Sequence, residues 1–157
     1  MRSKKIKTVL TIFSVTTILT LLFIWGQSVI PSAGSAKEST SVKNAIEGVL
    51  NFVALKELIV SENLVRKLAH IIEYSLLGLQ FPVLAVFSEK KIERMAFGKI
   101  YPKIALLPML VAVIDETIQI FSLRGSQVSD IWIDFAGATF AMIISLLICL
   151  KIRKSQR

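Results

Sequence analysis

Four predominantly apolar segments constrain the fold of this chain more than any other feature. They lie at about 8–30, 69–88, 101–122 and 128–150, and each has the length of about 20 residues that a transmembrane helix needs. A membrane-spanning segment must satisfy its backbone hydrogen bonds without water, and at this length a helix does so. The sequence therefore predicts an all-α fold, a polytopic membrane bundle of four transmembrane helices in one domain over residues 1–157.

Basic residues in the tails and around the loops predict the orientation of the chain, because positive charges concentrate in cytoplasmic loops and tails. They form three clusters, which are Arg2, Lys4, Lys5 and Lys7; Lys90, Lys91, Arg94, Lys99 and Lys103; and Lys151, Arg153, Lys154 and Arg157. All three clusters fall on one side of the membrane, so both termini are predicted to be cytoplasmic. The net charge of +8 comes without a basic patch interleaved with aromatic residues, so nucleic acid is not an expected partner.

Two features of the amino-terminal third leave alternatives open. The first apolar segment could be a cleaved signal peptide, but its length exceeds the about 7–15 residues of a signal core and favours a retained anchor. Between the first and second segments, at about 41–60, apolar residues recur at helical spacing. They predict an extracytoplasmic amphipathic helix, which either packs on the bundle or lies in the outer membrane interface.

The ionisable groups of the last three segments gather at the ends that this topology places outside the cell. They are Arg66, Lys67, His70 and Glu73 around the start of the second segment, Asp115 and Glu116 near the end of the third, Arg124 in the following turn, and Asp130 and Asp134 at the start of the fourth. The neutral amide of Gln119 lies near the two acids of the third segment. Ionisable groups in a membrane usually face a bundle interior or a wet cavity, which makes them functional candidates. Three helices are therefore expected to bring them together at one level.

On the second segment, three of these polar residues share one helical face. Arg66, His70 and Glu73 follow at intervals of four and three residues, which are neighbouring positions on a helix surface. A single histidine is more often a hydrogen-bonded structural group than a ligand. The carboxylate of Glu73, one turn deeper, has no comparable structural explanation and favours a functional interpretation.

Helical spacing also relates the polar residues of the third and fourth segments. Gln119 lies one turn from both Asp115 and Glu116, so its amide can face inward with at least one of the acids. Asp130 lies in the first turn of the fourth segment, where an acid offsets the helix dipole. Asp134 lies about 6 Å deeper, where the dipole explanation weakens.

The proposed pocket would hold five carboxylates and two or three cations, which cannot all keep a full charge away from water. Three arrangements would reduce the charge repulsion among the acids. The acids could share protons, they could bind a cation, or Arg66 and Arg124 could neutralise them in a purely structural network. Histidine and carboxylates bind zinc, and oxygen-rich sets bind calcium or magnesium. The possible divalent-metal ligands are His70, Glu73, Asp115 and Asp134. Their spacing matches no established metal signature, so no cofactor is assigned.

Two sequence blocks carry a family resemblance. The first is Arg66-Lys67-x-x-His70-x-x-Glu73-Tyr74-x-x-Leu77-Gly78, and the second is Asp115-Glu116-x-x-Gln119-x-Phe121, followed by Arg124, Asp130, Asp134 and Gly137. Together they resemble the VanZ-like family of small bacterial membrane proteins. Two departures from the family pattern are Leu123, where Pro-Gly often precedes the arginine, and Ala141, where a later glycine stands.

The resemblance implies a protein of the bacterial cytoplasmic membrane and cell envelope, because the first family member is associated with resistance to the glycopeptide teicoplanin. The expected partners are the lipid bilayer and, in an outward-facing pocket, a peptidoglycan precursor, an anionic lipid or a glycopeptide. The expected ligand-binding residues are Arg66, His70, Glu73, Asp115, Glu116, Gln119, Arg124, Asp130 and Asp134.

The alternative function is a membrane-embedded hydrolase or transferase that acts on a lipid-linked envelope substrate. His70, Glu73, Asp115 and Glu116 would be the candidate catalytic residues, since an imidazole beside a carboxylate suits general acid–base chemistry. No nucleophile is evident beside them in the sequence. A transporter is disfavoured, because the polar groups stop in the outer half of the spans.

Overall fold

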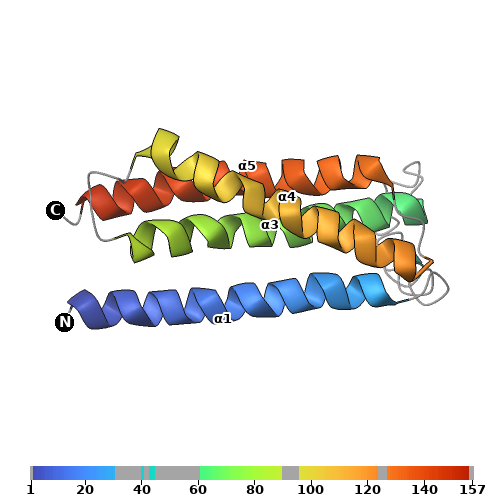
Figure 1. Ribbon diagram of the computed structural model, residues 1–157, viewed down its shortest axis with the longest axis horizontal. Coiled ribbons are helices and arrows are strands. Elements are labelled where there is room, and N and C mark those ends of the chain that lie inside the picture. The colour runs from blue at the N-terminus through green and yellow to red at the C-terminus, as the bar shows by residue number, and fades with distance from the viewer. Residues whose placement is uncertain are drawn as a thin grey trace.

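The computed structural model describes residues 2–30, 40, 43–44, 61–89, 96–123 and 127–155. Its four long helices are α1 (Arg2–Val29), α3 (Glu62–Ser88), α4 (Phe97–Phe121) and α5 (Val128–Ser155). Each is long and apolar enough to cross a membrane, and the described residues contain no strand. The predicted all-α bundle of four spans is thereby confirmed (Figure 1). The predicted amphipathic segment lies outside the described residues, apart from the helical pair at 43–44.

Three helices begin earlier than the apolar segments that predicted them, and α5 extends beyond its predicted end. The largest difference is at α3, which begins at Glu62 because Ser61 caps it. The side chain of Ser61 accepts a hydrogen bond of 3.1 Å from the backbone N–H of Leu64, which satisfies a donor that a helix start leaves free. Residues outside the apolar segments therefore lengthen α1, α3 and α4 at their starts and α5 at its end.

The helices form a bundle in which both described ends of the chain lie on the same side (Figure 1). We call the opposite side the distal end; Val29, Glu62, Phe121 and Val128 mark it. The helix α4 crosses the bundle obliquely, so that its first turns lie beside α5 and its last turns approach α1. The most extensive helix contact is between α3 and α5.

A glycine makes the close contact between α3 and α5 possible. A Cβ atom added at Gly78 would lie only 2.1 Å from the backbone oxygen of Ala138. Small residues let two helix backbones approach in this way, which is a common means of association in membranes.

The apolar core has two parts, distinguished by their position along the bundle. Toward the distal end, Tyr74, Leu77, Ala112 and Ala138 are completely buried, and Ile24 of α1 packs with them. Toward the other end, Val86, Met142 and Leu146 form the centre of a second cluster, which Ile100 and Ile104 of α4 complete. The distal cluster lies directly beneath the polar residues described below.

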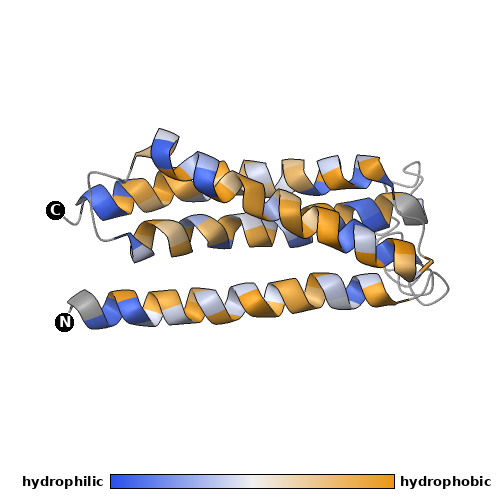
Figure 2. Cartoon of the chain, viewed as in Figure 1, coloured by the Kyte–Doolittle hydropathy of each residue, from blue (hydrophilic) through white to orange (hydrophobic). Residues whose placement is uncertain are grey.

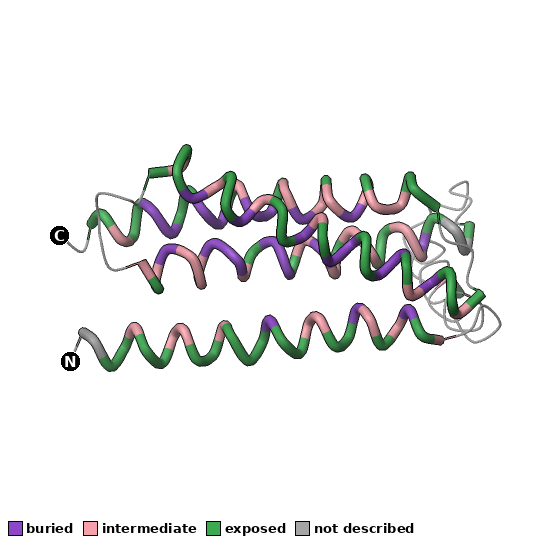
Figure 3. The backbone as a smooth tube through the Cα atoms, in the orientation of Figure 1, coloured by how far each residue is buried: buried purple, intermediate pink, exposed green. Residues whose placement is uncertain are grey.

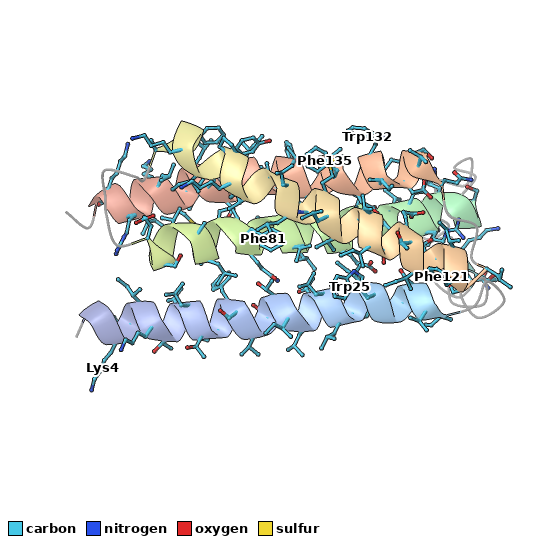
Figure 4. The ribbon with its side chains drawn as sticks, viewed as in Figure 1. Lys4, Trp25, Phe81, Phe121, Trp132 and Phe135 are labelled. Carbon is cyan, nitrogen blue, oxygen red and sulfur yellow. The ribbon has the colours of Figure 1, made fainter. Side chains whose placement is uncertain are left out.

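The helix α1 is the most peripheral member of the bundle (Figure 3). Only 11% of its most apolar window is buried, compared with 44% for α5, so most of its surface is left for lipid. In Figure 4, Trp25 points from α1 toward the other helices, whereas Lys4 points away at the opposite end of α1. An opening of about 500 Å³ separates α1 from α3 and α4 near Leu10, Phe81 and Leu107.

The outer surfaces of the helices are apolar along most of their length (Figure 2). Leucine, isoleucine and phenylalanine side chains stay exposed on every helix, as at Leu22, Ile72, Leu110 and Phe140. Continuous exposed apolar surface of this kind marks contact with a membrane. The chain is thus built as a multi-pass membrane protein, with polar side chains concentrated at the helix ends.

Candidate functional site

Three helices bring one imidazole and two carboxylates together in the distal half of the bundle. The Nδ1 atom of His70 on α3 lies 3.9 Å from Oδ2 of Asp115 on α4 and 3.7 Å from Oδ2 of Asp134 on α5. Each residue offers one ligand atom, and these three atoms lie within 4.8 Å of one another. Both carboxylates are fully buried, whereas His70 is half-buried. The three residues form what we call the His-Asp-Asp cluster.

Hydrogen bonds from two helices hold the carboxylate of Asp115 in place. The hydroxyl of Ser28, which is completely buried on α1, donates to Asp115 Oδ1 at 2.5 Å. The amide Nε2 of Gln119 donates to Asp115 Oδ2 at 3.1 Å and to Glu116 Oε1 at the same distance. Gln119 thus faces inward with both acids, as its spacing predicts. All four helices therefore contribute to this polar region.

Glu116 and Ser122 connect the distal ends of neighbouring segments. The backbone N–H of Gln127, just before α5, donates to Glu116 Oε2 at 3.0 Å. The hydroxyl of Ser122 donates to the backbone oxygen of Ser28 at 2.7 Å. These contacts fix the end of α4 against α1 and against the start of α5.

Asp134 differs from Asp115 because its oxygens accept no hydrogen bond from the described residues. Its side chain is nevertheless completely buried, and its Oδ2 atom lies 3.7 Å from Nδ1 of His70. The buried hydroxyl of Tyr74 also has no hydrogen-bond partner in the described part of the chain. More than about 90% of buried polar groups in proteins are hydrogen-bonded, so the carboxylate of Asp134 is an exception to the general pattern.

A small recess leads from the surface to the cluster. Its lining residues are Arg66, Lys67, His70, Asp130, Ile133 and Asp134. Its volume of about 10 Å³ is close to the minimum that holds one water molecule. Across this recess, Lys67 Nζ lies 3.1 Å from Asp130 Oδ1, and both side chains are partly exposed. A single water molecule or ion fits inside, and a larger ligand would contact the rim.

The structure separates the predicted site residues into groups. His70, Asp115 and Asp134 meet directly, and Glu116 and Gln119 are joined to them by hydrogen bonds. Arg66 and Asp130 line the recess. Glu73 is half-buried on α3 and does not belong to the His-Asp-Asp cluster, although the sequence analysis named it as one of four possible metal ligands. Arg124 lies outside the described residues.

Ser28 is the residue of this region that the sequence did not indicate. Serines are common in apolar helices because the hydroxyl can bond to the carbonyl one turn earlier, as Ser28 does to Ile24 at 3.3 Å. Its partner Asp115 is 87 residues away in the sequence, so no local pattern could connect them.

The cluster can support two kinds of chemistry. An imidazole with carboxylates is a suitable set of ligands for a divalent transition metal, and the same groups can accept and donate protons. Ser75 is not positioned as a nucleophile, because its hydroxyl donates to the backbone oxygen of Gly137 at 3.2 Å.

Comparison with known families agrees with the polar motifs. The family described as VanZ/LLP1 matches residues 13–149, which include most of all four helices and every residue of the cluster. No curated protein and no solved structure matches the chain significantly. Because the match covers far more than half of the sequence, the chain belongs to the VanZ/LLP1 family and is a VanZ-like multi-pass membrane protein.

Proposed function

We propose that this protein contributes to resistance against teicoplanin-type glycopeptides in the bacterial cell envelope. Its distal end would face the cell exterior and engage a peptidoglycan precursor, a lipid head group or a lipopeptide ligand. The observation that carries the proposal is the His-Asp-Asp cluster beneath a recess that Arg66 and Lys67 line. Burying ionisable groups from three helices at one membrane level costs free energy, and groups retained at such a cost usually serve a function.

The lining of the recess favours a ligand that carries a phosphate or a carboxylate. Arg66 is half-buried there, and no ion pair occupies its guanidinium among the described residues. A planar guanidinium binds such groups through two parallel hydrogen bonds. Lys67 already contacts Asp130, so Arg66 is the cation that we expect a ligand to meet first. The apolar flanks of the helices would keep a lipid-tailed ligand in the bilayer beside the recess.

The second candidate is a hydrolase or transferase acting on a lipid-linked envelope substrate. The observation that favours it is the imidazole of His70 within 3.9 Å of two buried carboxylates, an arrangement suited to general acid–base chemistry. Conversion of a labelled lipid-linked precursor by the purified protein, lost in His70→Gln, would favour the enzyme. Binding of the same precursor without turnover would favour the recognition role.

Resistance itself can be tested in a strain that lacks the gene. Complementation with the wild type should raise the inhibitory concentration of teicoplanin, whereas Glu116→Gln and Asp134→Asn should leave it at the level of the empty vector. Thr16→Val is the control, because Thr16 is exposed on α1 and bonds only within its own helix. Equal susceptibility of all strains, at equal protein levels in the membrane, would contradict the resistance role.

The orientation of the chain is a separate prediction. The end of the bundle opposite the cluster carries exposed lysines on α1 and α5, including Lys4, Lys7 and Lys151, and positive residues favour the cytoplasm. A green fluorescent protein fused after Arg157 should therefore fluoresce, and alkaline phosphatase at the same position should be inactive. Active phosphatase would place the cluster on the cytoplasmic side and contradict an outward-facing pocket.

A further inference from the structure

We propose that His70, Asp115 and Asp134 bind a divalent transition-metal ion, and that zinc is the ion that fits them best. Metal binding does not depend on the proposed role in resistance, because it can be measured on the purified protein without any envelope ligand. The argument rests on the separation of the three side chains, the burial of Asp134, the support of Asp115 and the recess beside them.

The distances in the cluster suit a bridging ion better than direct hydrogen bonds. A nitrogen-to-oxygen hydrogen bond measures about 2.7–3.2 Å, and the two contacts of His70 Nδ1 are longer, at 3.7 and 3.9 Å. Zinc binds nitrogen and oxygen at about 2.0–2.2 Å in tetrahedral geometry, which places neighbouring ligand atoms about 3.4 Å apart. To reach that spacing, the two contacts of His70 would each have to shorten by a few tenths of an ångström. The ligand oxygens of Asp115 and Asp134, which lie within 4.8 Å of each other, would have to approach by up to about 1.4 Å.

Asp134 supplies the independent observation that points to a ligand. Its carboxylate is completely buried, accepts no hydrogen bond from the described residues and faces His70. A charged group taken out of water without partners is strongly unfavourable. A bound cation would ligate one oxygen and provide the missing interaction.

Asp115 has the supporting contacts that metal ligands usually have. Ser28 donates to Oδ1, and Gln119 donates to Oδ2, which lies 3.9 Å from Nδ1 of His70. Such outer contacts orient a ligand before the metal arrives and raise the affinity. The site therefore combines Asp115, whose carboxylate is held by hydrogen bonds, with Asp134, whose carboxylate accepts none from the described residues.

The recess provides access to the cluster and would leave room for water as a fourth ligand. Both His70 and Asp134 line it, and its volume of about 10 Å³ matches a single water molecule. Three protein ligands with water at the fourth position is the usual arrangement of a reactive zinc site. Calcium and magnesium fit less well, because they require six or more oxygen ligands and seldom take a nitrogen.

The test is zinc binding to the full chain, purified in detergent and treated with a chelator. Titration against a zinc-sensitive dye should give one equivalent for the wild type. His70→Gln and Asp134→Asn should lose more than about 100-fold in affinity, and Ser28→Ala, which removes only a supporting contact, about 10–100-fold. Glu89→Gln is the matched control, because Glu89 follows α3 at the opposite end of the bundle. Its affinity should equal that of the wild type.

Circular dichroism and gel filtration should show that each variant folds. A wild type that binds neither zinc nor manganese, iron or cobalt would overturn the proposal, as would a folded Asp134→Asn variant with unchanged affinity. X-ray absorption of the zinc-loaded wild type gives a second measurement that needs no variant, since histidine scattering should be present and its absence would contradict the site. A protein that binds zinc but confers no resistance would contradict only the proposed function.

Discussion

Gly78→Ala is expected to destabilise the bundle by about 1–3 kcal/mol, because the added methyl group has no space. The new Cβ would lie 2.1 Å from the oxygen of Ala138 and 2.9 Å from its carbonyl carbon and its Cα. All three atoms belong to the backbone of α5 and cannot rotate away. The most extensive helix contact of the bundle would therefore have to separate.

The matched control for this variant is Gly26→Ala. An added Cβ at Gly26 meets nothing within 4 Å, and alanine is favoured over glycine in a helix by about 1 kcal/mol. The free energy of unfolding, measured by titration with sodium dodecyl sulfate in mixed micelles, should fall for Gly78→Ala and stay equal or rise for Gly26→Ala. Equal values for both variants would show that α3 and α5 do not approach this closely.

Ser28→Ala is expected to reduce the free energy of unfolding by about 1.5–3 kcal/mol, the range for a hydrogen bond to a charged group. The substitution removes the hydroxyl that donates to the buried Asp115 and so weakens the connection between α1 and α4. The same titration in mixed micelles measures the loss. Thr16→Val serves as the control, because it removes only an exposed hydrogen bond within α1. Equal losses in the two variants would contradict the interhelical role of Ser28.

The number of spans could be predicted from the sequence, because an apolar stretch of the length of a bilayer is a local signal. The helix ends were less predictable. An apolar segment ends where the hydrocarbon layer of the membrane ends. The helix α3 extends further, through polar residues to Glu62, where a capping residue ends it. That cap is Ser61, which lies eight residues before the apolar segment predicted to start at about residue 69.

The meeting of His70, Asp115 and Asp134 could be expected because topology places the ends of three helices at one level. What the sequence could not indicate was which acid meets which partner. Rotation of each helix about its axis decides this, and packing sets that rotation. Depth along the helix then separates two acids that share a face of α5. Asp134 joins the cluster, whereas Asp130, one turn nearer the distal end, pairs with Lys67. The role of Ser28 depends on packing in the same way.

The opening between α1 and its neighbours has a consequence for how this protein responds to its surroundings. In a bilayer, lipid hydrocarbon tails would enter the opening and contact the apolar side chains that line it, such as Leu10 and Leu107. A substitution that shortens one of these side chains would leave no empty cavity, because a mobile acyl chain would fill the space. Lipid cannot reach the closely packed core around Met142, so removing a methyl group there would leave a cavity.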